Sequence, residues 1–305
     1  MVTTIERSIK QTYVALRWAI LVFVGLLLLA VLYTGWSTGA WQTSISGYYY
    51  TAARPVFVAS LCAIGACLVL YHADNPENLL LDFAGFLAFV VAFVPTAIDF
   101  REPPPGTLNV PTATDVASTV QASVLALLVA GVIAVFVGWT LWRREFDVGP
   151  GESIPTHTKG ALAVCLVALS FGLAIYFFAS TLIENHAHWV AAVSMFVLLF
   201  FVVLVNTRQV DRRNGSTGFW SFVRWSVRTL FTRNGQQGAS FRLYVTAARL
   251  MPASAVVLGL LGLAGFGHWI FWAEAVMILL FGIFWQRQTA EFLNRSSQGP
   301  LQLQA

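Results

Sequence analysis

Long apolar segments recur along the whole chain and are separated by short polar connections. A helix needs roughly 20 apolar residues to cross a bilayer core, because each residue rises about 1.5 Å and lipid offers no partner for backbone polar groups. Eight segments meet this requirement, and Pro95 and Pro252 interrupt the third and the seventh. They lie at 13–35, 54–72, 78–98, 116–142, 160–183, 188–207, 244–266 and 268–286. The pattern predicts an all-α, polytopic transmembrane helix bundle of about eight spans, with seven as the alternative count.

Lysine and arginine are distributed unevenly among the connections. If the N-terminus is cytoplasmic, only Arg54 and Arg101 of the 18 basic residues fall on the outer side. Cytoplasmic connections are enriched in Lys and Arg, and one missed span would invert the side of every later loop. The distribution therefore predicts that the N-terminus and the C-terminus are both cytoplasmic.

The composition agrees with a single membrane unit. Hydrophobic residues make up 57% of the chain and charged residues 10%, whereas about a quarter of the residues are charged in an ordinary soluble domain. We therefore expect residues 1–305 to form one integral membrane domain. The net charge of +4 does not indicate nucleic-acid binding, because the basic residues lie beside apolar segments and form no continuous tract.

The longest predicted cytoplasmic connection contains an amphipathic pattern at 218–234. Apolar side chains recur there at helical spacing, although Phe222 and Trp225 project elsewhere. The basic residues of this segment are Arg224, Arg228 and Arg233. Basic amphipathic helices lie in the headgroup region of anionic membranes. We predict an interfacial helix whose arginines contact anionic lipids of the cytoplasmic leaflet, and the alternative is a loop docked against the bundle.

Small residues predict where helices pack closely, because they let two backbones approach each other. They are Ala59, Ala63 and Cys67 in the second segment and Gly259, Gly262 and Gly265 in the seventh.

Charged side chains inside a span are costly, so each is a candidate functional residue. Asp82 lies about one turn inside the predicted cytoplasmic boundary, and Glu274 lies roughly two turns inside the outer one. Asp82 can cap its helix or pair with Arg17, and this structural interpretation competes with a catalytic one. Glu274 must find a partner, stay protonated or face water, and Arg54 lies at a comparable depth.

Three of the five histidines fall on the predicted outer side, close to Glu274. Imidazole and carboxylate together are zinc ligands, so His186, His188 and His268 with Glu274 form a candidate zinc site. The spacing in ENHAHW matches no known zinc pattern, and residues two apart point to different faces of a helix. The alternative interpretation is interfacial histidines that bind headgroups or loop backbone.

The stretch SISGYYYTAARPVFVASLCAIGACLVLYHADNPENLLLDFAGFLAFVVAFVP, with the later FWAEAVMILLFGIFW, resembles an uncharacterised family of bacterial multi-pass membrane proteins. The layout is also remotely similar to the seven-span superfamily of ceramidase-like and progestin-receptor-like membrane hydrolases, which uses a Ser in the second span, an Asp in the third and histidines that hold zinc. Ser60 and Asp82 occupy comparable spans, but no late span contains the paired histidine motif. This second resemblance implies zinc hydrolysis and is incomplete.

Three functions are therefore compatible with the sequence. The first is a non-enzymatic integral membrane protein that acts through lipids, partners or a small solute. The second is a membrane-embedded, metal-dependent hydrolase with the outer His and Glu site. The third is a proton-coupled transporter of a small solute that uses Glu274. Walker, GxSxG and HExxH motifs are absent from the sequence, so no common soluble-enzyme motif points to another activity.

Overall fold

All regular elements in the described part of the chain are helices, which confirms the predicted all-α class. The computed structural model describes residues 4–71, 77–98, 105–108, 112–145, 186–210, 219–231 and 238–297. The helices are α1 (Thr4–Thr38), the short 3-10 helix η1 (Ser46–Tyr50), α2 (Arg54–Leu70), α3 (Glu77–Phe93), α4 (Ala113–Glu145), α7 (His188–Val210), α8 (Phe219–Phe231), α9 (Ala239–Leu263) and α10 (Trp269–Ser297).

Five of the described helices, α1, α4, α7, α9 and α10, are long and apolar enough to cross a membrane. Helix α2 is a shorter apolar helix of 17 residues, and α3 has the same length. Each predicted span overlaps one of these helices except the fifth, at 160–183, which lies outside the described residues. The described part of the chain is thus all-helical, with membrane-like apolar helices.

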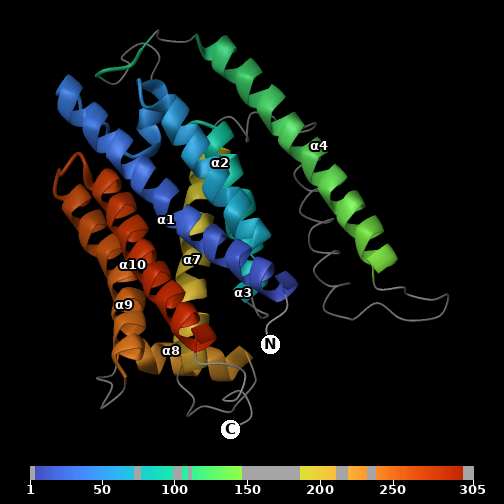
Figure 1. Ribbon diagram of the computed structural model, residues 1–305. Coiled ribbons are helices and arrows are strands. Elements are labelled where there is room, and N and C mark those ends of the chain that lie inside the picture. Colours follow the sequence, from blue (N-terminus) through green and yellow to red (C-terminus); the bar gives the residue numbers. More distant parts are fainter. Residues whose placement is uncertain are drawn as a thin grey trace.

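Six helices form a ring in which each one packs against two neighbours. The contacts run from α1 to α2, α3, α7, α9 and α10, and α10 closes the ring by packing against α1. Helix α4 packs against α3 beside this ring, and α8 lies across one end of it (Figure 1). We call the end that carries α8 the α8 end and the opposite one the η1 end. The start of α1 and the end of α10 both lie at the α8 end (Figure 1).

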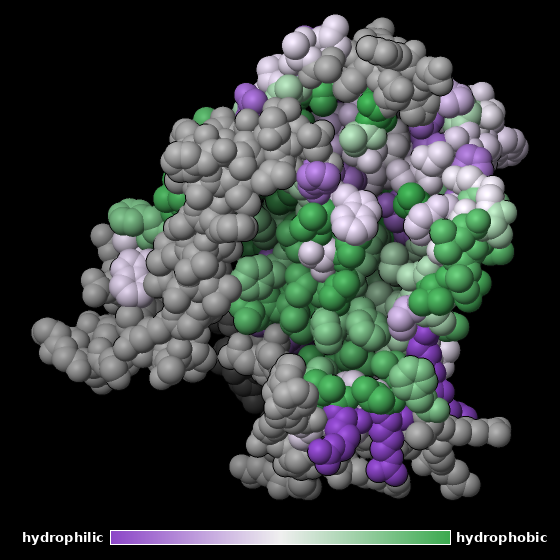
Figure 2. All heavy atoms as spheres, turned by 180° about the vertical axis from the view of Figure 1, so that it is seen from behind, coloured by the Kyte–Doolittle hydropathy of each residue, from purple (hydrophilic) through white to green (hydrophobic). Residues whose placement is uncertain are grey.

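The ring encloses an aromatic and aliphatic core. Its largest fully buried side chains include Trp285, Phe284, Tyr244 and Leu81, which come from α10, α9 and α3. Many large apolar side chains instead point outward, and Figure 2 shows them as a green band above a purple, hydrophilic edge. An apolar belt of this kind exceeds the patches that soluble monomers expose, and it is typical of a surface that faces lipid.

Two glycines allow α2 and α3 to approach each other closely. A Cβ atom added at Gly65 would lie 2.7 Å from the carbonyl oxygen of Gly85, and the reverse distance is also 2.7 Å. Of the three glycines of the seventh segment, only Gly262 lies at the close contact that the prediction requires. Gly259 faces open space, and Gly265 has a φ of +96° in the turn after α9, where a positive φ favours glycine. Gly262 lies in α9, and an added Cβ there would lie 2.5 Å from Cδ1 of Trp269, the first residue of α10, so this glycine makes room for α10.

Candidate functional site

Helix α8 occupies the segment in which the sequence predicts an amphipathic helix. Trp225 is only 6% exposed and packs against Phe241 and Val245 of α9. Phe222 stacks on Trp225, with 6.4 Å between the ring centres. The two side chains that interrupt the amphipathic pattern are therefore the ones that dock α8 on the bundle.

Polar contacts also hold α8 in place. The guanidinium of Arg249 in α9 donates a 2.7 Å hydrogen bond to the carbonyl oxygen of Thr229, and Arg208 of α7 donates to the hydroxyl of Ser221 at 3.2 Å. Thr229 lies in the last turn of α8, where carbonyl groups lack partners within the helix and a positive charge is favourable. Arg249 thus satisfies the helix end and fixes it to α9.

The opposite face of α8 is exposed. Val227 and Arg228 each lie three or four residues from both Arg224 and Phe231, so the four side chains form one stripe along the helix. Val227 is 53% exposed and Phe231 84% exposed. Two arginines therefore lie beside two apolar side chains on the face that points away from the bundle. Arg233, the third predicted lipid contact, lies outside the described residues.

Beside α8, a buried cation occupies the interior of the ring. Arg17 is 2% exposed, and its guanidinium carbon lies 4.8 Å from the ring centres of both Tyr71 and Trp285. Its Nη2 donates a 2.7 Å hydrogen bond to the hydroxyl of Tyr71, and its Nη1 donates to Oε1 of Gln288 at 3.3 Å. Aromatic faces stabilise a desolvated cation electrostatically, so this arginine links α1, α2 and α10.

The side-chain amide of Gln288 extends this network to two more helices. Its nitrogen donates to Oε1 of the buried Glu77 at 3.1 Å and to Oδ1 of Asn206 at 2.6 Å. The indole nitrogen of Trp285 also donates to the carbonyl oxygen of Arg17 at 3.1 Å. Side chains from α1, α3, α7 and α10 thus meet through hydrogen bonds at the α8 end.

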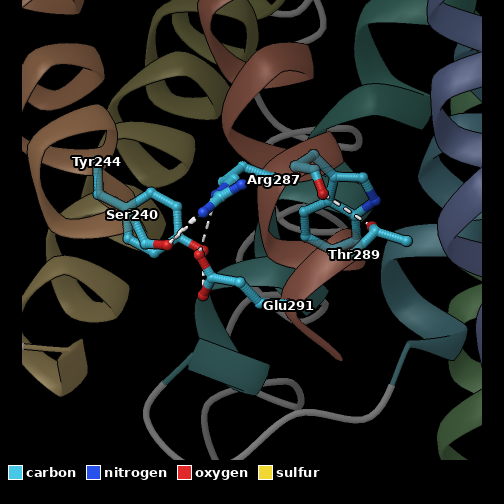
Figure 3. A network of polar contacts seen from close by, with 6 residues as sticks. Ser240, Tyr244, Arg287, Thr289 and Glu291 are labelled. Carbon is cyan, nitrogen blue, oxygen red and sulfur yellow. Dashed lines mark hydrogen bonds and ion pairs between the residues drawn. The ribbon is translucent and has the colours of Figure 1, made fainter. Parts of the chain in front are cut away.

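A second polar network joins α9 to α10 at the same end (Figure 3). Arg287 forms an ion pair of 3.3 Å with Glu291 and donates a 2.9 Å hydrogen bond to Ser240 of α9. The hydroxyl of Tyr244 donates to the other carboxylate oxygen of Glu291 at 3.0 Å. Both oxygens of this carboxylate are therefore used to hold two neighbouring helices together.

Asp82 and Glu274, the two candidate catalytic carboxylates, each have a hydrogen-bond partner. Asp82 accepts a 3.1 Å hydrogen bond from Asn78 in its own helix, and Arg17 contacts other groups. Glu274 accepts a 2.6 Å hydrogen bond from the backbone N–H of Ile45, which precedes η1. Arg54 instead donates to the hydroxyl of Tyr49 at 2.7 Å. Glu274 therefore holds the η1 segment against α10.

The three outer histidines contact backbone or solvent. Nδ1 of the buried His188 donates to the carbonyl oxygen of Val94, and Nδ1 of His268 donates to that of Gln42 at 3.2 Å. His186 is exposed in the turn before α7. Among the described residues no three His, Cys, Asp or Glu side chains lie close enough to share a metal ion. Zinc binding at these positions stays a prediction, and it requires these side chains to come closer together, because Nε2 of His188 and His268 can coordinate a metal while Nδ1 keeps its carbonyl partner.

The sequence-based interpretation missed Gln288, Asn206 and Arg249, which connect the helices at the α8 end. Their location in the sequence could have identified them, because each is a polar residue within two turns of the end of an apolar segment. Comparisons with protein-family models, with curated proteins and with solved structures found no match. The class of protein therefore rests on the fold, which is an all-α bundle with membrane-like helices.

Proposed function

We propose that this chain is a non-enzymatic, multi-pass protein of the bacterial inner membrane that binds anionic lipids of the cytoplasmic leaflet through α8. The exposed stripe of Arg224, Val227, Arg228 and Phe231 is the observation that carries the proposal. On an interfacial helix, apolar side chains enter the boundary of the acyl chains while arginines reach the phosphate groups.

The charges at the α8 end support a cytoplasmic orientation. Arg7 of α1 and Arg242 of α9 are exposed there, in addition to the arginines of α8. The carboxylates of Glu77 and Glu291 accept hydrogen bonds from Gln288 and Tyr244 within the bundle. The exposed charges that a membrane surface meets at this end are therefore mainly positive, which attracts anionic headgroups and agrees with the positive-inside rule.

The docking of α8 supports binding by a preformed surface. Trp225 and Arg249 hold the helix on the bundle before any lipid arrives. A surface that is already ordered loses little conformational entropy when it binds, so more of the interaction free energy is available for affinity.

Photocrosslinking tests the proposal. The protein is placed in nanodiscs that contain a photoactivatable phosphatidylglycerol or phosphatidylcholine, and the labelled peptides are mapped. Each arginine near an anionic surface contributes about 1 kcal/mol, so Arg224→Gln with Arg228→Gln should lower labelling of α8 by phosphatidylglycerol roughly 30-fold.

The matched control is Arg7→Gln with Arg242→Gln. This variant removes the same charge from the same end of the bundle and leaves α8 intact, so labelling of α8 should fall much less. Equal labelling of α8 by both lipids, or an equal loss in the control variant, would contradict the proposal.

A further inference from the structure

A cavity of about 590 Å³ opens at the η1 end of the molecule, between η1, the start of α2 and the start of α4. Its lining residues from η1 and α2 are Tyr49, Tyr50, Thr51, Ala52, Arg54 and Pro55. Leu108, Asp115, Val116 and Thr119 complete the lining from the side of α4. Small-molecule sites commonly have volumes of about 300–1,000 Å³, so this η1 cavity has the size of a ligand site.

Two opposite charges line different walls of the η1 cavity. Arg54 is the first residue of α2, and Asp115 lies in the first turn of α4. Within the described part of the chain these two side chains form no ion pair with each other. Both side chains are exposed, so a ligand that enters the cavity can reach them.

Each of the two charged side chains is held by a neighbouring residue and still has hydrogen-bonding groups available for a ligand. The guanidinium of Arg54 lies 4.3 Å from the ring centre of Tyr49 and donates one hydrogen bond to its hydroxyl. A guanidinium has five N–H donors, so most of them remain available. Oδ2 of Asp115 accepts hydrogen bonds from the N–H and the hydroxyl of Thr112, which caps α4, and Oδ1 accepts none within the described residues.

The aromatic wall of the cavity is rigid and neutral. The hydroxyl of Tyr50 donates a 2.9 Å hydrogen bond to the carbonyl oxygen of Thr96, and the N–H of Leu108 donates to the carbonyl oxygen of Tyr50 at 3.0 Å. Burial raises the pKa of Tyr50 well above its usual range, so its phenol carries no charge at neutral pH. The charges that select a ligand are therefore those of Arg54 and Asp115.

We propose that the η1 cavity binds a zwitterion of the phosphoethanolamine type, with its phosphate at Arg54 and its primary ammonium at Asp115. A ligand with only a negative charge would be repelled by Asp115, and one with only a positive charge would be repelled by Arg54. A bidentate guanidinium matches phosphate oxygens, and a carboxylate accepts hydrogen bonds from an ammonium.

The geometry disfavours a quaternary ammonium such as phosphocholine. Such a group has no N–H to donate to Asp115, and proteins recognise it through aromatic faces. The face of Tyr49 is already covered by the guanidinium of Arg54. Phosphoethanolamine occurs both as a free solute and as the headgroup of phosphatidylethanolamine, and the η1 end of a membrane bundle lies at the level where headgroups are found.

Two arms of one experiment test the site and distinguish these sources. In the first, free phosphoethanolamine is titrated into the purified full-length protein in detergent by calorimetry, with phosphocholine for comparison. In the second, native mass spectrometry measures retained phosphatidylethanolamine, phosphatidylcholine and phosphatidylglycerol. Binding of free phosphoethanolamine identifies a solute site, and retention of phosphatidylethanolamine alone identifies a lipid site; either result supports the proposal.

Four variants show whether the two charges are responsible. Arg54→Gln and Asp115→Asn should each weaken phosphoethanolamine binding about tenfold, because each removes one charge-assisted contact. Arg54→Lys keeps the positive charge and should retain part of the affinity. Thr112→Ala removes the hydroxyl contacts that cap α4 and hold Asp115 but keeps the carboxylate, so it should bind nearly as wild type does.

Three results would overturn the proposal. They are equal binding of phosphocholine or phosphatidylglycerol, unchanged binding in Arg54→Gln and Asp115→Asn, and a loss in Thr112→Ala as large as that in Asp115→Asn. No binding of either phosphoethanolamine or phosphatidylethanolamine by the wild-type protein would overturn it as well.

Discussion

Alanine at Gly65 or Gly85 should destabilise the bundle, because these glycines form the contact between α2 and α3. The added Cβ at either position would lie 2.7 Å from the carbonyl oxygen of the other glycine, and real Cβ atoms essentially never come within 3.0 Å of another heavy atom. The Cβ at Gly85 would also lie 2.8 Å from Cγ2 of Val69. Since backbone atoms cannot rotate away as a side chain can, the two helices must separate.

The expected magnitude follows from two opposing effects. Overpacking costs about 1–3 kcal/mol, whereas replacing glycine by alanine inside a helix contributes about 1 kcal/mol of stability. Gly282 of α10 has no atom within 4 Å of an added Cβ, so Gly282→Ala experiences only the second effect. Gly65→Ala should therefore be about 1–3 kcal/mol less stable than the matched control. The effects at Gly65 and Gly85 should not add, because both substitutions disturb one contact.

Thermal unfolding in detergent with a thiol-reactive dye measures this difference. Cys62 and Cys67 are free cysteines on α2 itself, so in a Cys165→Ser background the dye reports the exposure of the helix that the substitution displaces. A difference of about 2 kcal/mol corresponds to roughly 4–8 °C in Tm. If Gly65→Ala melted at or above the temperature of Gly282→Ala, the close approach of α2 and α3 would be refuted.

Substitutions at three further positions probe the polar and aromatic contacts. Arg17→Ala should lower the free energy of unfolding by about 3 kcal/mol or more, since it removes a desolvated cation–π contact and charged hydrogen bonds. A Tm equal to that of the wild type in the same dye assay would contradict this. Trp225→Ala should cost about 3 kcal/mol of docking, and faster tryptic cleavage within α8 is the readout. Glu274→Gln keeps an acceptor for the N–H of Ile45 and should melt near wild type, whereas Glu274→Leu should lose about 1–3 kcal/mol. Loss of solute uptake in Glu274→Gln would instead favour a transporter that titrates this carboxyl.

The helices at the predicted spans could be foreseen because the requirement for a span is local. A run of apolar residues must form a helix in lipid whatever its neighbours are, so α1, α7 and α10 follow from composition and length. The same holds for α8, whose arginines and apolar residues recur at helical spacing.

The partners of the charged groups could not be foreseen, because they are set by how distant segments meet. Glu274 binds a backbone N–H of Ile45, 229 positions away in the chain, and every residue except proline offers such a group. Depth in the membrane suggested Arg54 as the partner, but Tyr49 lies five positions from Arg54 and binds it locally. The close contact of Gly65 with Gly85 was missed for a related reason, since a glycine shows where approach is permitted and not which helix approaches.

Within the described residues, α4 shares fewer buried side chains with the ring than the ring helices share with one another. The buried side chains of Arg17 and Gln288 connect the helices of the ring through hydrogen bonds, and Gly65 allows α2 to lie directly on α3. The cluster that holds α4 at the η1 end contains two buried residues, Val94 and Val120. Because Arg54 belongs to the ring and Asp115 to α4, a zwitterion that contacts both adds a second attachment for α4. Binding of such a ligand should therefore stabilise the position of α4 more than that of η1 and α2, because η1 and α2 are already held by the ring.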